Sequence, residues 1–241
     1  MKDNRLSQFI EKVIPKPKLQ TYISDLIEVG YNQYGPTLGL EGVLTALTKV
    51  ILIENIKIQL KYEKSEDIHT FGWFAFLPHE FILDQIREYE FKMPSKFMVA
   101  PKHPHNCNII FSDHEHYAEM NPSIKRIKNG WRNIFQNVTP EQNINYRELL
   151  EKFKNSSDMQ SNIEKLTKLC YWLEGEYFLT TTINSKNPNQ TFEIKKTFSL
   201  SQNDVDQLKN NAEIIIADLC KLPEINYFYA KLTLSTPPSK K

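Results

Sequence analysis

The chain has 241 residues, of which 40% are hydrophobic and 24% are charged, as in folded globular proteins and unlike disordered ones. Its 30 basic and 29 acidic residues leave a formal net charge of +1, without the basic excess of dedicated nucleic-acid binders. The three cysteines are far apart and form no Cys-x-x-Cys pair, which argues against a disulfide scaffold and favours a reducing compartment.

No membrane attachment is expected either. The first eighteen residues are too polar for a secretory signal. The longest apolar run, near residues 50–53, is far shorter than the roughly 20 residues that span a bilayer. We therefore expect a cytoplasmic protein.

The first part of the chain predicts helices. One short helix is expected over residues 6–14, and a second over 19–27, where apolar residues recur at helical spacing. A third is expected over residues 37–53. Its Gly39 and Gly42 lie one turn apart and are not followed by the Lys-Ser/Thr pair of a phosphate-binding loop, so close helix packing explains them better.

An antiparallel hairpin follows. Residues 56–62 alternate between apolar and lysine or glutamine side chains, which describes a strand with one buried face. The polar segment 63–67 predicts a turn. The next strand, 68–77, is aromatic on both faces and should be more central.

The middle of the chain mixes short elements. A short helix is expected over residues 79–90, and short strands over 97–101 and 108–111. A helix then runs to about Phe135, with Asn121 as its N-cap and a proline in the first helical position.

The remaining residues predict two helices and then a β-β-α-β unit. Capping patterns begin the helices at Thr139 and at Ser157, and a third such pattern at Ser201 begins the helix of the unit. The three strands of the unit are expected over residues 176–183, 191–200 and 225–234.

These elements define the expected fold class as α+β: a helical N-terminal part with an antiparallel hairpin, then helices and a C-terminal β-β-α-β unit. We expect a single domain over residues 1–234. The alternative is two lobes, 1–136 and 139–234, although the composition does not change between them. Residues 235–241 are expected to be a disordered tail.

The segment 103–117 holds four of the six histidines: His103, His105, His114 and His116. Imidazole and thiolate groups are preferred ligands of zinc, and each histidine pair alternates, so that both members of a pair would face one way on an extended strand. If the chain turned between the pairs, they would form a site for a divalent metal, zinc or manganese. Asp113 and Glu115 would then supply oxygen ligands or orient an imidazole.

Two alternatives weaken the metal site. The spacing matches no zinc-finger or zincin pattern, and the apolar run 108–111 is typical of a strand that would carry the pairs apart. The first alternative is that these histidines lie in an exposed polar loop. A histidine could also act as a general base without metal, beside Cys107 or Ser112, but no nucleophile motif surrounds either residue.

A second constellation is Glu193 and Lys195, separated by one residue within the strand expected over 191–200. Together with the order of elements over residues 158–234, this pair resembles the core of a large class of metal-dependent nucleases. The resemblance implies catalytic roles for both residues, with carboxylates holding a divalent cation and the lysine stabilising developing charge. The preceding strand, 176–183, lacks the acid near its end that this class carries. Solvent-facing charges on an edge strand are the alternative.

A basic helix is the third candidate site. Four cationic residues surround Trp131, a combination that can bind single-stranded nucleic acid by charge and stacking. They are Lys125, Arg126, Lys128 and Arg132. Because Ile124, Ile127 and Trp131 share one helical face, a buried tryptophan beside a solvated basic face is the stronger reading.

Aromatic residues make up 12% of the chain, more than one face of a sheet needs, and aromatic side chains are enriched at protein interfaces. The leading hypothesis is therefore a cytoplasmic subunit, adaptor or regulator that binds another protein, needs no cofactor and has no catalytic activity. The alternative is a metal-dependent hydrolase of the nuclease class, with its site at the histidines or at Glu193 and Lys195.

Overall fold

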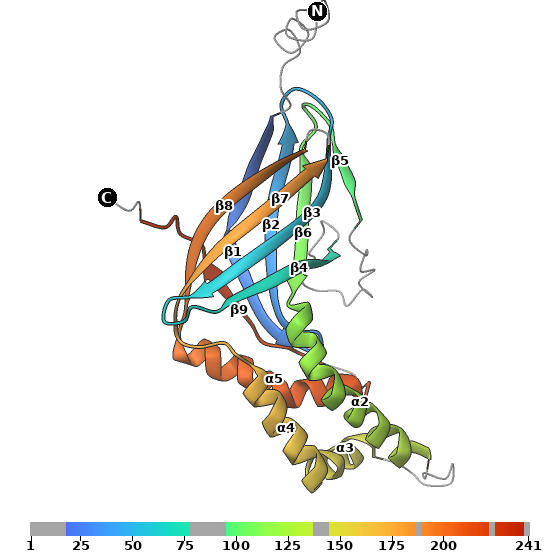
Figure 1. Cartoon of the computed structure of the whole chain (residues 1–241). Helices are drawn as coiled ribbons and strands as arrows, with labels where there is room; N and C mark the ends of the chain where they lie inside the picture. Colours follow the sequence, from blue (N-terminus) through green and yellow to red (C-terminus); the bar gives the residue numbers. More distant parts are fainter. Residues whose placement is uncertain (1–17, 78–94, 137–144, 187–188, 222–224, 239–241) are drawn as a thin grey trace, which may run out of the picture.

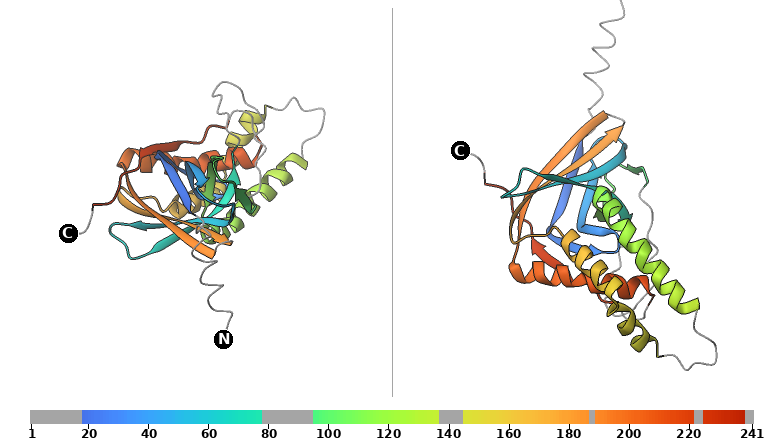
Figure 2. Two further views of the ribbon diagram at one scale, coloured as in Figure 1. Left: turned by 90° about the horizontal axis from the view of Figure 1, so that it is seen from above. Right: turned by 60° about the horizontal axis from the view of Figure 1, so that its bottom comes forward.

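The computed structural model describes residues 18–77, 95–136, 145–186, 189–221 and 225–238. Of these residues, 47% are in strands and 33% in helices, and the architecture is a curled antiparallel sheet with helices packed at one end (Figure 1). The prediction of a helical N-terminal part is therefore wrong over the described residues 18–77, which form strands rather than helices. Figure 2 shows from two further sides how the strands curl around a common interior.

The described residues form one nine-stranded sheet. Eight strands follow one another in the order β8-β7-β3-β4-β6-β2-β1-β9, and β5 pairs with β3 beside this path. The strands are β1 (Leu19–Asn32), β2 (Gly35–Ala46), β3 (Ile51–Tyr62), β4 (Ile68–Phe76), β5 (Phe97–Val99), β6 (His105–Ser112), β7 (Gly175–Lys186), β8 (Asn189–Leu200) and β9 (Tyr229–Thr233).

A β-bulge explains why residues 19–27 imitate a helix. The β1–β2 register shifts between Ile23 and Ile27, so three residues of β1 lie opposite one residue of β2. The bulge displaces the apolar positions from strict alternation into helical spacing. Ile27 faces the core, whereas Tyr22 and Leu26, expected on the same helical face, are 61% and 58% exposed.

The expected helix over residues 37–53 is instead β2 and the beginning of β3. Leu38, Leu40 and Leu44 alternate into the core, which is strand periodicity. Gly39 and Gly42 would weaken a helix, but here they lie where neighbouring backbone and side chains press against β2. An added Cβ at Gly42 would lie 2.7 Å from the carbonyl oxygen of Tyr22.

The hairpin and most later elements are confirmed. β3 and β4 pair antiparallel, and the predicted order β7, β8, α5 (Gln202–Leu219), β9 is present. However, β9 pairs with β1 rather than with β8, so this sequence of elements is not a separate unit. Its last strand instead completes the far end of the sheet.

Three further helices lie at one end of the sheet: α2 (His114–Gln136), α3 (Tyr146–Lys154) and α4 (Ser157–Leu169). α2 begins seven residues before the predicted N-cap, Asn121, and contains Pro122 within it. Its first turn is capped instead by Asp113, whose Oδ1 accepts a hydrogen bond from the His116 N–H at 3.1 Å.

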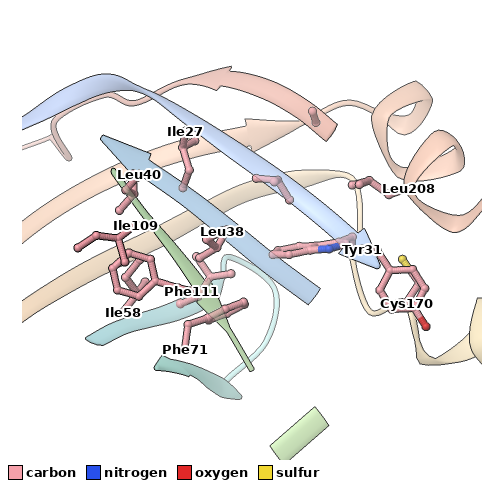
Figure 3. Close-up of a cluster of buried hydrophobic side chains, with 14 of the residues drawn as sticks. Ile27, Tyr31, Leu38, Leu40, Ile58, Phe71, Ile109, Phe111, Cys170 and Leu208 are labelled. Carbon is pink, nitrogen blue, oxygen red and sulfur yellow. The ribbon is translucent and has the colours of Figure 1, made fainter. Parts of the chain in front are cut away.

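The core fills the concave side of the curled sheet and continues between the sheet and the helices. Figure 3 shows part of it, with aliphatic and aromatic side chains from β1, β2, β3, β4 and β6. Cys170 and Leu208 extend this cluster toward the helical end. The aromatic surplus is thus largely used in packing, as with the fully buried Phe71, Phe111 and Trp172.

Buried hydrogen bonds attach the helical end to β1. The Tyr31 hydroxyl donates to the Leu166 carbonyl at 2.6 Å, and the Trp172 indole donates to the Gly30 carbonyl at 3.0 Å. The Asn211 side chain donates to the carbonyls of Tyr31 and Phe228 and accepts from the Phe228 N–H. Helices and sheet are therefore joined by directional bonds as well as by apolar packing.

Several sequence-based predictions lie outside the described residues. These are the helices over residues 6–14 and 79–90, the capping pattern at Thr139 and the lobe boundary after residue 136. Ser235, the first residue of the expected tail, is described and pairs with Thr197 of β8.

Candidate functional site

The four clustered histidines lie at the two ends of β6. His103 is in the exposed turn before this strand, and His105 is its first residue. His114 and His116 lie beyond its last residue, in the first turn of α2. An eight-residue strand spans roughly 25 Å, so the structure does not bring the two pairs together. In the described part of the chain, no three or more His, Cys, Asp or Glu side chains are arranged to hold a metal ion.

Asp113 gathers a different set of polar side chains where β6 meets α2. Its Oδ2 accepts a hydrogen bond from the Tyr171 hydroxyl at 3.2 Å and lies 3.4 Å from Nδ1 of His69. The His69 ring stacks on Tyr171 with 4.0 Å between the ring centroids, and His116 meets the same tyrosine edge-on. Sequence reasoning named Asp113 and His116 but missed His69 and Tyr171, which lie about 45 and 60 residues from them along the chain.

The electrostatics of this cluster follow from burial and hydrogen bonding. Burial raises the pKa of Asp113, but the bonds from His69, the His116 amide and Tyr171 outweigh it and hold the pKa below its usual value. Burial lowers the pKa of His116, although Asp113, the Leu169 carbonyl and Glu119 oppose the shift. Burial and Asp113 raise the pKa of Tyr171. The arrangement keeps Asp113 ionised, and it joins β4, β6, α2 and the segment before β7.

The two residues considered as nucleophiles are not activated. Cys107 is buried in β6, and burial raises its pKa to about 12, which suppresses the reactive thiolate. The Ser112 hydroxyl is also buried, and it donates to the Tyr34 carbonyl at 3.0 Å.

Glu193 and Lys195 both lie on the outer, exposed face of β8. Opposite them in β7 stand Thr182 and Thr180, so this part of the neighbouring strand supplies no carboxylate. The inward positions between and beside them are Phe192 and Ile194, which pack against the core. This placement matches charges that protect an edge strand.

The basic helix shows the same separation of faces. Trp131 is buried, with its ring centroid 5.5 Å from that of Phe153, and Ile124 and Ile127 lie beside it in the core. The cationic side chains are all exposed on the other side of α2: Lys125, Arg126, Lys128 and Arg132. An aromatic surface for base stacking is therefore not available at Trp131.

The segment that follows β9, at one end of the sheet, meets β8, at the other end, at one place that we call the waist. There a single segment runs between β1 and β8. The Leu234 N–H donates to the Asp25 carbonyl on one side, while Ser235 and Thr197 exchange two backbone hydrogen bonds of 2.8 Å on the other. Lys196 of β8 also reaches Asp25, with 3.5 Å between Nζ and Oδ1.

Beyond the waist, no described residue bonds to both β1 and β8. Among the described residues, no strand pairs with the outer edge of β8 over 189–196, or with the outer edge of β1 over 19–24. We call these two stretches together the seam. Unpaired edges of this kind present rows of backbone donors and acceptors.

The direction of the backbone groups at the seam follows from the bonds at its limits. Because Thr197 bonds outward to Ser235, the N–H and C=O groups of Thr191, Glu193 and Lys195 also point outward, by strand alternation. On the other side, the Lys18 carbonyl accepts from Leu47 of the β2 side. Backbone direction alternates along a strand, so Lys18 and every second residue after it point toward β2. Thr21 lies between two such residues and therefore directs its N–H and C=O groups into the seam.

The seam also exposes part of the apolar interior. Leu19 and Ile23 of β1 and Phe192 and Ile194 of β8 pack against the core but are only half-buried. The residues that follow the waist are Thr236, Pro237 and Pro238. Proline has no N–H, so this segment cannot continue hydrogen bonding along either edge.

Comparison with family models, with curated proteins and with solved structures finds no match to this chain. Among the described helices, none combines the length and the apolar character that crossing a membrane requires.

Proposed function

We propose that this protein is a binding subunit or adaptor that takes up an extended segment of a partner protein at the seam. The segment adds as a strand to the edge of β8. The observation that carries this proposal is the row of outward backbone groups on Thr191, Glu193 and Lys195, which no described residue pairs.

Strand addition suits this edge for two reasons. The main-chain bonds provide affinity for any extended segment, and side chains at alternate positions provide selectivity. The inward-facing positions of β8 at this edge are the half-buried Phe192 and Ile194. Apolar side chains of the partner would pack beside them and be removed from water. Glu193 and Lys195 limit unspecific pairing of the same edge.

A cytoplasmic location belongs to the same proposal. Cys107, Cys170 and Cys220 are buried free thiols, a usage typical of reducing compartments.

The first test selects binders from a displayed library of random twelve-residue peptides. We expect binders rich in β-branched and aromatic residues. Their affinity should fall about tenfold or more in Lys195→Pro, because this variant lacks one outward N–H and its ring disturbs the contact with the added strand. Lys195→Ala, which removes the same side chain but keeps the N–H, is the matched control against which the loss in Lys195→Pro is measured. Hydrogen exchange should show that the bound peptide protects the amides of Glu193 and Lys195.

The proposal fails if the selected peptides bind Lys195→Pro as tightly as Lys195→Ala. It also fails if the amides that the peptide protects lie outside β8.

A further inference from the structure

We infer that the partner segment becomes a central strand, inserted between β8 and β1 in line with β9 and hydrogen-bonded on both sides. The inference rests on the proposed function and goes further, because addition of a strand to one edge requires hydrogen bonds to β8 and none to β1. It also specifies the partner: an extended, proline-free segment with apolar side chains at alternate positions.

The waist carries the geometric argument. Leu234 and Ser235 belong to one chain segment, which bonds to β1 through Asp25 and to β8 through Thr197. Adjacent strands lie about 4.8 Å apart, so the edges of β1 and β8 are separated at this point by about twice that distance. The seam therefore begins with the width of a single strand.

Both edges direct compatible backbone groups into the seam. Thr191, Glu193 and Lys195 do so from β8, and Leu19, Thr21 and Ile23 from β1. A segment that continued the direction of β9 would run antiparallel to both strands. Its successive residues would bond alternately to one edge and to the other.

Side chains of the inserted segment would face two environments. On the concave side they would meet Ile23, Phe192 and Ile194, which are half-buried beside the core. On the convex side they would lie between the exposed Tyr22 and the charged pair Glu193 and Lys195. This alternation sets the apolar and polar pattern of the partner.

The chain's own continuation is prevented from filling this place. In continued register, the position opposite Lys195 is that of Pro237, and the next position, toward β1, is that of Pro238. The two prolines remove one donor on each side. They stop the closing strand at the waist and leave both edges to a partner.

The test uses the full chain and a synthetic twelve-residue peptide in which valine alternates with threonine, with lysines at its ends. A peptide of the same composition with a central proline is the control ligand. Two variants each remove one N–H that points into the seam and leave the ladders to β7 and β2 intact: Lys195→Pro and Thr21→Pro. Lys195→Ala and Thr21→Ala are their matched controls.

We expect each proline variant to bind the peptide about tenfold or more weakly than the alanine variant at the same position, which keeps the N–H. If only Lys195→Pro weakens binding, the segment adds to β8 alone, and the inference fails while the proposed function stands. If neither variant weakens binding, both fail. A dimer of the wild type that Lys195→Pro dissociates would also overturn the inference, since a second copy would then occupy the edge.

An independent arm changes the two prolines. In the double variant Pro237→Val/Pro238→Thr, the closing strand can continue past the waist. We expect the amide of Lys195 to exchange rapidly in the wild type and to become protected in the double variant, and peptide binding to fall about tenfold or more. Protection of Lys195 already in the free wild type, or unchanged peptide binding in the double variant, would overturn the inference.

Discussion

Asn211 is a fully buried polar side chain and His116 a largely buried one, and the two differ in their hydrogen bonding. Asn211 is 0% exposed, and its amide bonds to three backbone groups of the β1 and β9 ends. His116 has an 11% exposed side chain, and its Nε2 has no hydrogen-bond partner among the described residues. The first should therefore stabilise the fold, and the second should make stability depend on pH.

Replacing Asn211 by alanine should cost roughly 3 kcal/mol of unfolding free energy, because two carbonyls and one N–H would remain buried without a partner. Urea unfolding of Asn211→Ala measures this loss. The control is Asn210→Ala on the exposed face of the same helix, which should stay within about 0.5 kcal/mol of the wild type. Equal stabilities of the two variants would contradict the assigned role.

The pH dependence follows from the lowered pKa of His116. Since the folded state resists protonation, the unfolded state binds more protons once the pH falls below its histidine pKa of about 6.5. The stabilisation is present above this value and is lost as the pH falls from there toward the lower folded pKa.

Urea unfolding between pH 8 and pH 5 should show this decline in the wild type and a smaller one in His116→Gln. His103→Gln, in the exposed turn before β6, is the matched control. A decline of equal size in His116→Gln and in the wild type would assign the dependence to other groups.

At the scale of the elements, the β-bulge in β1 shows where sequence reasoning failed. Periodicity in a single segment cannot tell an amphipathic helix from a strand whose alternation is interrupted, because both place apolar residues three and four apart. The bulge is stabilised by its pairing with β2, which a local pattern does not contain. Elements with undisturbed patterns, such as β7, β8 and the capped helix α5, were predicted well.

The two sides of β8 should tolerate proline differently. Ile194 directs its N–H to β7, so Ile194→Pro breaks a ladder bond and should cost roughly 1–3 kcal/mol or more. Lys195→Pro removes an N–H that no described residue accepts, and should cost less than about 1 kcal/mol. Thermal unfolding of both variants checks this order, and the reverse order would refute the assigned directions of the backbone groups.

For the whole molecule, the candidate site depends on residues that are distant in sequence. The seam joins residues near position 20 to residues near position 190, and the Asp113 cluster joins β4, α2 and the segment before β7. Neither group of residues corresponds to a motif within a short stretch of sequence. Only the apolar alternation at Phe192 and Ile194 and the adjacent prolines near the end of β9 were visible beforehand.

The sequence by itself determined the local elements whose causes lie within a few residues. Apolar alternation predicted β3, aromatic residues on both faces predicted β4, and the Ser201–Asp204 capping box predicted the start of α5. Tertiary structure decided that residues 19–46 are sheet rather than helix, because the pairing of β1 with both β2 and β9 outweighs local helical spacing. It also decided that the closing strand lies beside β1 and touches β8 only at the waist, since closure depends on the accumulated curl of the whole sheet.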